Sequence, residues 1–123
     1  MIIKMVLEQV KKEMNVKKKG NHGENEFANW MQENGIKMYR NSSSGAGMYK
    51  GDINNSLDLT IEIKTVKKIN LMEAWRQVSK DSSIAHNSPL LAIHFDGMPK
   101  RNWLIVLNSE DWIELIKNQT KSL

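Results

Sequence analysis

Three side chains near the middle of the chain have the types and spacing needed for phosphodiester chemistry. Asp52 precedes a short polar turn, and Glu62 and Lys64 follow it, two residues apart. In a strand, residues two apart share a face and lie about 6 to 7 Å from each other. If the turn folds the chain back, Asp52 lies across from Glu62. Paired carboxylates suit Mg²⁺, and an ammonium group beside them can stabilise charge on a phosphate or help deprotonate a metal-bound water.

The segment that carries Glu62 alternates apolar and polar residues. Taken alone, such alternation favours an ordinary antiparallel strand with one solvated face. The position of Asp52 across the turn is what favours a metal site instead. The two predicted faces are Leu57, Leu59, Ile61 and Ile63 on one side, and Asp58, Thr60, Glu62 and Lys64 on the other.

A third acid is expected from a helix over residues 24–34. Steps of about 100° per residue place Glu24 on the same face as Phe27 and Ala28, with Glu26 nearly opposite. We therefore expect Glu24 to point toward the sheet and Glu26 toward water. A carboxylate on the buried side needs a partner, and a metal ion is one candidate. The alternative is an acid placed near a helix N-terminus, where the helix dipole favours it.

A further polar candidate lies on a helix expected over residues 70–83. Gln77 borders the apolar stripe of this helix, formed by Leu71, Ala74, Trp75 and Val78. It could orient a water or contact a phosphate, or it could be an ordinary boundary residue. Four tryptophans invite a base-stacking role, but each lies in an apolar-patterned element, which favours packing in the core or at a dimer surface. These are Trp30, Trp75, Trp103 and Trp112.

The elements that must position these residues follow from apolar periodicity and from turn and cap residues. They predict one α/β domain, residues 1–123, built as a sandwich around a mixed sheet. The first helix has Ile2, Ile3, Val6, Val10 and Met14 as candidate buried positions. The expected elements are helix 2–14, a polar connection 17–23, helix 24–34 ended by Gly35, strand 36–40, a Ser/Gly loop 41–51, a strand from 52, strand 57–66, helix 70–83, strands 90–95 and 103–107, and helix 110–118 capped by Ser109.

Composition excludes several classes of protein. With 40% hydrophobic and 26% charged residues, the chain is typical of a globular protein, and no apolar run is long enough to span a membrane. The absence of cysteine excludes disulfides and thiolate zinc sites, and an intracellular location is expected. The net charge of +4 is compatible with a polyanionic partner. Lysines crowd the first twenty positions, which alone is more typical of a solvated surface.

Glu24, Gly51-Asp52 and the run 61–64 (Ile-Glu-Ile-Lys) together resemble the PD-(D/E)XK nuclease superfamily, whose core order is αβββαβ. The chain is more closely similar to the archaeal-type Holliday junction resolvases and their phage relatives. Shared features are Lys19-Gly20 ahead of the helical Glu24, a strand ending at Arg40, and the Ser/Gly loop after it. The similarity covers about residues 19–107.

The resemblance implies a restriction-endonuclease-like core with added N- and C-terminal helices. It implies that Glu24, Asp52 and Glu62 bind Mg²⁺, for which Mn²⁺ would substitute, and that Lys64 assists the attacking water. It also implies a homodimer that cuts branched DNA at a four-way junction, in a cell or encoded by a phage. The DNA contacts expected from it are Lys19, Arg40, Gln77 and the loop serines Ser42, Ser43 and Ser44.

Two departures from the family pattern keep alternatives open. Asn25 stands where archaeal members often have arginine directly after the first glutamate, and the hairpin before Glu62 is short. A related nuclease of restriction-like, nicking or end-processing type is therefore the nearest alternative to a junction resolvase. A DNA-binding protein of the same fold without catalysis is the second, although such a protein has no chemical need for Asp52, Glu62 and Lys64 together.

Overall fold

The computed structural model describes residues 2–42 and 51–121, except for the side chains of residues 13–19 and 120–121. Its strands form a two-stranded sheet, β1-β2, and a three-stranded mixed sheet in the order β3-β4-β5. The elements are α1 (Ile2–Glu33), β1 (Met38–Arg40), β2 (Ile53–Asn55), β3 (Leu59–Val66), α2 (Leu71–Ala85), β4 (Ser88–Phe95), β5 (Leu104–Val106) and α3 (Ser109–Lys121).

The sheet is built around a parallel pair. β3 and β4 run side by side over eight residues, and α2 provides the crossover that parallel strands require. β5 adds to β4 in antiparallel fashion, and β1 pairs antiparallel with β2. The predicted α/β class with a mixed sheet between helices is confirmed.

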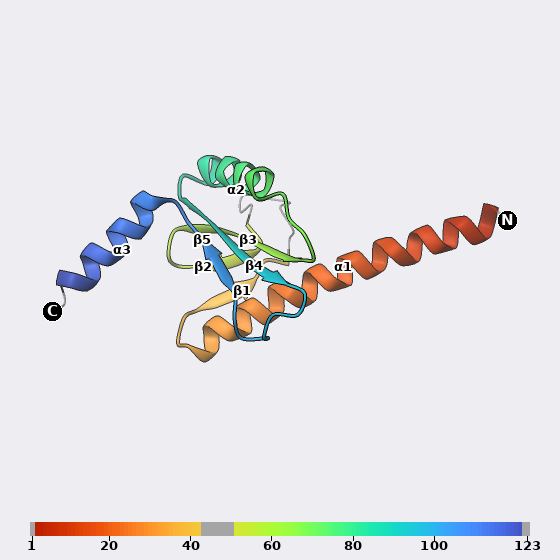
Figure 1. The fold of residues 1–123 in the computed structure, drawn as a ribbon, viewed down its shortest axis with the longest axis horizontal. Coiled ribbons are helices and arrows are strands. Elements are labelled where there is room, and N and C mark those ends of the chain that lie inside the picture. The colour runs from red at the N-terminus through yellow and green to blue at the C-terminus, as the bar shows by residue number, and fades with distance from the viewer. Residues whose placement is uncertain (1, 43–50, 122–123) are drawn as a thin grey trace.

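Helices cover both faces of the sheet (Figure 1). The C-terminal half of α1 packs on one face, where Phe27 and Ala28 meet Ile61 and Ile63. α2 packs on the opposite face, where Ala74 and Val78 meet Leu91 and Ile93. Glu62 and Lys64 therefore lie on a strand that is held between two apolar layers.

The prediction that β3 has one wet face is wrong in detail. Thr60 is as buried as Ile61, and its hydroxyl donates to Asn87 Oδ1 at 2.6 Å. A parallel strand covered by helices on both sides buries both faces. The predicted strand also begins too early, because Asp58 has a positive φ of 56° and Leu57 is exposed.

α1 is one continuous helix, so the predicted polar connection over 17–23 is wrong. Gly23 explains why a glycine occurs there without a turn. A Cβ at this position would collide with the side chain of Thr65 on β3, whereas one at Gly20 would meet open space. Gly23 is therefore a close-contact residue that lets α1 lie directly on β3. The expected stop at Gly35 is confirmed by its φ of +78° and by the hydrogen bond from its amide to the Gln32 carbonyl.

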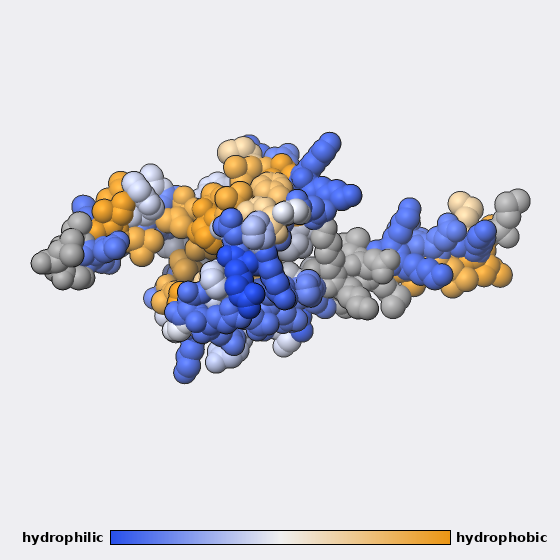
Figure 2. Space-filling model, turned by 60° about the horizontal axis from the view of Figure 1, so that its bottom comes forward, coloured by the Kyte–Doolittle hydropathy of each residue, from blue (hydrophilic) through white to orange (hydrophobic). Residues whose placement is uncertain are grey.

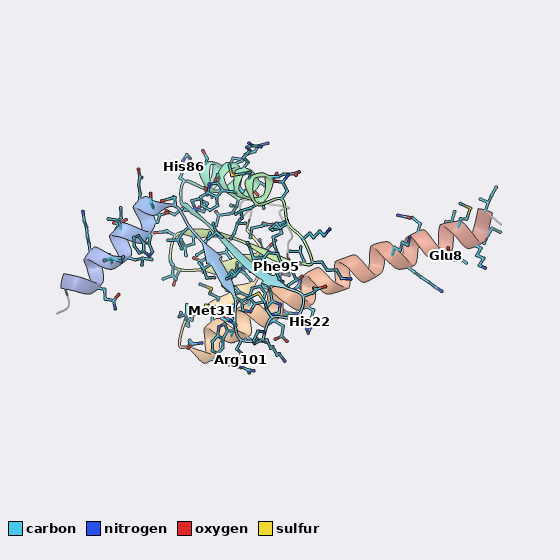
Figure 3. The ribbon with its side chains drawn as sticks, viewed as in Figure 1. Glu8, His22, Met31, His86, Phe95 and Arg101 are labelled. Atoms are coloured by element: carbon cyan, nitrogen blue, oxygen red, sulfur yellow. The ribbon has the colours of Figure 1, made fainter. Side chains whose placement is uncertain are left out.

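The N-terminal part of α1 projects away from the sheet, and its residues 2–12 are called the arm below (Figure 1). Glu8 lies far from the other labelled side chains, which surround the sheet (Figure 3). The prediction that Ile2, Ile3, Val6 and Val10 are buried is wrong for the single chain, because all four are between 45 and 79% exposed. The side chain of Met14 lies outside the description. Among the described residues, no helix combines the length and apolar character that a bilayer crossing requires.

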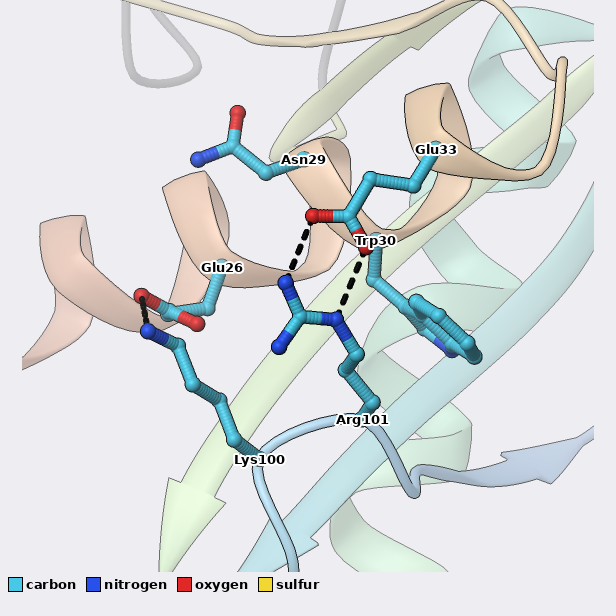
Figure 4. Close-up of a pocket in the computed structure, with 6 residues that line it drawn as sticks. All are labelled: Glu26, Asn29, Trp30, Glu33, Lys100 and Arg101. Atoms are coloured by element: carbon cyan, nitrogen blue, oxygen red, sulfur yellow. Dashed lines mark hydrogen bonds and ion pairs between the residues drawn. The ribbon is translucent and has the colours of Figure 1, made fainter.

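The β4–β5 connection clamps the C-terminal half of α1 (Figure 4). Arg101 donates to both carboxylate oxygens of Glu33, at 2.7 and 2.8 Å, and its guanidinium lies 5.9 Å from the Trp30 ring centroid. Lys100 pairs with Glu26 at 3.4 Å. Glu26 was expected to face water, but this loop covers it and leaves its side chain only 20% exposed.

The structure corrects the predicted cap of α3 and shows that the tryptophans differ in their burial. α3 begins at Ser109, but the capping side chain is that of Asn108, whose Oδ1 accepts from the Asp111 amide at 2.9 Å. Trp103 packs edge-on against Phe27, as expected of a core residue. Trp112 instead is 57% exposed.

Candidate active site

Asp52 is fixed at the junction of the two sheets. Its amide donates to the Ile61 carbonyl at 2.8 Å, and its carbonyl accepts from the Asn41 amide at 2.7 Å. The buried Asn41 side chain also donates to the Gly51 carbonyl at 2.9 Å. Finally, Asp52 Oδ2 accepts from the Ile63 amide at 2.8 Å. These bonds hold the carboxylate beside the middle of β3, as the turn between Asp52 and Glu62 predicted.

Glu62 and Lys64 share one face of β3. Lys64 Nζ lies 3.7 Å from Glu62 Oε1, and their side chains are 35% and 18% exposed, respectively. Asp52 lies close enough for its charge to raise the pKa of Glu62. Asp52 and Glu62 therefore form an acid pair, with the ammonium group of Lys64 beside Glu62.

α1 brings Glu24 to the same place from the opposite layer. The contact at Gly23 seats the helix on β3, and the next residue, Glu24, turns inward until its side chain is 17% exposed. Glu24 pairs with Arg40 Nη1 at 3.8 Å, and Asp52 lies close enough for its charge to raise the pKa of Glu24. The prediction that this helical acid points toward the sheet is confirmed by its position.

Arg40 stands at the end of β1, next to the acids. Besides Glu24, its Nη1 contacts Asn21 Oδ1 at 3.4 Å. Its side chain keeps 29% of its surface exposed. Two residues of α1, Glu24 and Asn21, thus orient the guanidinium, which is still exposed enough to bind a ligand.

Burial raises the pKa of all three acids, and the charge of Asp52 raises the pKa of the two glutamates further. Burial, and then the charge of Asp52, raise the pKa of Glu62 to about 7, with Lys64 opposing. Burial, and then Asp52, also raise the pKa of Glu24 to about 7, with Arg40 opposing. Burial raises the pKa of Asp52 itself, against the Ile63 amide and Lys64, which lower it. Burial and a neighbouring negative charge disfavour the ionised form of a carboxylate, and a bound cation favours it. This cluster of acids is therefore suited to a cation.

The donor set fits a magnesium ion held by few protein ligands. In the described part of the chain, no three or more His, Cys, Asp or Glu side chains form a group arranged to hold a metal ion. Asp52 and Glu62 are a pair of hard oxygen ligands, and Mg²⁺ binds through one or two carboxylates and keeps several waters. The residues therefore fit an ion whose remaining coordination positions are filled by oxygens of a phosphate and of water.

Sequence reasoning missed an acid on α2. Gln77 is exposed, and its amide donates to the Asp81 carboxylate at 3.3 and 3.4 Å. The charge of Asp81 in turn contributes to the raised pKa of Glu62. Asp81 follows Gln77 by one helical turn and so shares its face, a spacing that was visible in the sequence.

The remaining predicted DNA contacts lie at the edge of this site or outside the described residues. Ser42 is exposed in the turn after β1. Ser43 and Ser44 lie outside the described residues. Lys19 lies on α1, but its side chain is outside the description.

A basic groove adjoins the acids along the end of β3. It has a volume of about 470 Å³ and is lined by Gly20 and residues 63–68. Lys64 is the member shared with the acid cluster, and Lys67 and Lys68 are exposed. The pocket in Figure 4 lies elsewhere, under the β4–β5 connection, and its charged residues are already paired with one another.

The comparison with known families identifies a match that spans nearly the whole chain. The model of the family described as archaeal Holliday junction resolvase (Hjc) matches residues 15–120 of 123. Its members are PD-(D/E)XK-type nucleases that generally depend on a divalent metal. The matched range contains Glu24, Arg40, Asp52, Glu62 and Lys64, but not the projecting start of α1. Among curated proteins, none matches this chain.

Proposed function

The chain belongs to the archaeal Holliday junction resolvase family, and from that premise we propose that it cuts four-way DNA junctions by Mg²⁺-dependent hydrolysis at Asp52 and Glu62. Its function is that of a Holliday junction resolvase nuclease, and its substrate is junction DNA. The observation that carries the proposed site is the hydrogen bond from the Ile63 amide, which holds the Asp52 carboxylate beside Glu62, with Lys64 Nζ 3.7 Å from Glu62 Oε1.

Asp52 and Glu62 are the proposed metal ligands, and Glu24, whose pKa is raised by the charge of Asp52, supports the site from α1. When bound, Mg²⁺ supplies an acidified water and draws negative charge from the scissile phosphate. Mn²⁺, which also takes oxygen ligands, is expected to substitute. The backbone bond from Ile63 to Asp52 fixes one ligand before any ion arrives, which reduces the ordering cost of binding.

Lys64 and Arg40 are the proposed positive groups. Lys64 lies beside Glu62 and can stabilise charge that develops on a phosphate oxygen. Arg40 keeps its guanidinium oriented by Glu24 and Asn21, and can hold a neighbouring backbone phosphate with two donors. Glu24, with a pKa of about 7, can accept or release a proton at this position near neutral pH.

The groove beside Lys64 is the proposed path of one DNA strand away from the acids. Lys67 and Lys68 add two exposed positive charges to it. Phosphate contacts of this kind position a duplex without reading its sequence. Lys19, Gln77 and the serines Ser42, Ser43 and Ser44 remain proposed contacts around the same path.

We further propose that the active form is a homodimer. A four-way junction has two strands to be cut symmetrically, and one chain holds one acid cluster. A twofold axis would present two such clusters to the two strands. The exposed Trp112 on α3 is a side chain that such a pairing could cover.

The decisive experiment compares substitutions at the acid pair with a matched acid elsewhere. Asp52→Asn and Glu62→Gln are expected to abolish Mg²⁺-dependent cleavage of a labelled synthetic four-way junction while junction binding persists. Asp58→Asn is the control, because Asp58 is exposed and its positive φ suits asparagine. Unchanged cutting by either acid variant, or equal loss with Asp58→Asn, would refute the proposed site. A linear duplex of the same sequence tests junction preference.

A further inference from the structure

The arm of α1, residues 2–12, lies outside the matched family range and has an uncovered apolar face. Ile3, Val6, Leu7 and Val10 recur at helical spacing on one side of it and are all at least 45% exposed. Lys11 borders this stripe, and Lys12 lies on the opposite side of the helix. In proteins most of the stability of a helix comes from packing its apolar face, and this stripe is exposed in the single chain.

The opposite end of the molecule carries an apolar groove of about 320 Å³. Asp111 is one of its lining residues, and its Oδ2 is shielded from solvent with no hydrogen-bond partner among the described residues. The other oxygen of Asp111 accepts only a long bond, 3.3 Å, from Ser88 Oγ. Glu114 adds a second acid to the rim. The apolar lining consists of Leu57, Leu59, Pro89, Leu90, Leu107 and Leu115.

The arm and the groove are complementary in character. The arm offers an apolar stripe bordered by Lys4 and Lys11, and the groove offers leucines bordered by Asp111 and Glu114. Figure 2 shows apolar residues along one side of the arm and over the end of the molecule that carries α3. A lysine beside the stripe would be a positive partner for the exposed Glu114.

The arm cannot reach the groove of its own chain. The two features lie at opposite ends of the long axis, and α1 is continuous between the arm and the sheet (Figure 1). If a second copy is related to the first by a twofold axis perpendicular to that long axis, the arm of each copy lies at the α3 end of the other. Such an exchange is reciprocal and closes after two copies.

We propose that residues 2–12 of one copy dock in the α3 groove of a second copy, so that two chains exchange their arms. The proposal deepens the homodimer suggested above by naming the surfaces that meet. It does not depend on the metal chemistry, because none of the residues involved belongs to the acid cluster.

Site-directed crosslinking tests which surfaces meet, and the cysteine-free sequence makes every introduced thiol unique. Full-length Val6→Cys and Leu115→Cys proteins are mixed in equal amounts and treated with a short bis-maleimide. The expected product joins positions 6 and 115 of different chains. Lys80→Cys, on the exposed side of α2, replaces Leu115→Cys in the control and should give little product. Crosslinks only between two arms, or none above the control, would overturn the proposal.

Charge substitutions give an independent test by sedimentation. Lys11→Glu is expected to weaken self-association by roughly fivefold, and Lys12→Glu, on the far side of the helix, to leave it unchanged. Combining Lys11→Glu with Glu114→Lys should restore association. Val6→Glu should weaken it by about tenfold or more. Equal effects of the two lysine substitutions would contradict the docking geometry.

Junction cleavage separates this inference from the proposed function. If Val6→Glu leaves a monomer that still nicks single strands of the junction, the acid site is correct and the arm serves pairing. If Val6→Glu changes neither association nor coordinated cutting while Glu62→Gln abolishes cutting, the arm exchange is refuted and the catalytic proposal stands.

Discussion

Asp52 Oδ2 accepts a hydrogen bond from the backbone amide of Ile63 at 2.8 Å. The bond joins the first acid of the site to the strand that carries the second, so it holds the Asp52 carboxylate beside Glu62. Burial is the cost, because it raises the pKa of both acids, and the charge of Asp52 raises the pKa of Glu62 further.

Substitutions of Asp52 should separate this bond from the charge. Asp52→Asn keeps an oxygen that can accept from Ile63, whereas Asp52→Ala leaves that amide without its partner. We expect the asparagine variant to be more stable than the alanine variant by about 1–3 kcal/mol. Urea unfolding in the absence of metal measures the difference, and equal stabilities would mean that the bond contributes nothing.

The metal-free protein should lose stability as the pH rises toward neutrality. Glu62 has an ordinary pKa of 4.5 and a folded-state pKa of about 7. Between these values the folded chain keeps a proton that the unfolded chain has lost, so stabilisation present in acid disappears as the pH rises through about 7. Glu24 acts in the same direction. Glu62→Gln should remove part of the loss, on the order of 1–3 kcal/mol at pH 8. If the free energy of unfolding depends on pH in the same way for the variant and the parent, Glu62 is not the cause of the loss.

Mg²⁺ should restore that stability. A ligand that binds only the folded state at about 100 times its dissociation constant adds about 2.7 kcal/mol. The unfolding temperature should therefore rise with added Mg²⁺ at pH 8, and Glu62→Gln should largely abolish the rise. Thermal scans with and without a chelator measure it. An identical rise in the variant would place the ion elsewhere.

Two glycines of α1 should respond in opposite ways to alanine. Gly20→Ala adds a methyl group in open space and should stabilise the helix by about 1 kcal/mol. Gly23→Ala forces a Cβ against the Thr65 methyl group and should destabilise the protein and displace Glu24. Adding Thr65→Ser removes that methyl and should recover stability and cleavage. If both alanine variants behave alike, α1 does not rest on β3 at Gly23.

Arg40→Ala should weaken junction binding and cleavage together. Its guanidinium is the proposed phosphate anchor, and it also opposes the raised pKa of Glu24. Arg40→Lys should recover only part of the binding, because lysine cannot make a two-donor contact. Electrophoretic binding and single-turnover cutting measure the two effects. Loss of cleavage with binding intact would argue against anchoring.

The acid pair could be predicted from sequence because it depends on short-range rules. Alternation sets Glu62 and Lys64 on one face, and a turn of fixed length brings Asp52 across. Helical periodicity likewise oriented Glu24 correctly. Each of these inferences uses geometry contained within a single element or a single turn.

The errors concern residues whose surroundings come from distant parts of the chain. Gly23 was interpreted as a break, yet its role is set by Thr65, a residue of another layer. Glu26 was assigned to water, but Lys100 covers it from the β4–β5 connection. Thr60 was placed on a wet face, which α2 and the partner Asn87 bury. Local patterns contain no information about such covering groups.

The seat of α1 on β3 has a mechanical consequence. The helix rests on Thr65 at Gly23, one residue before Glu24, so this contact fixes the part of the helix that carries the carboxylate. The part of α1 that follows this contact packs on the sheet through Phe27 and Ala28, and its end is paired with Arg101. A sideways force on the arm is therefore resisted beyond Gly23, and Glu24 keeps its place over the strand.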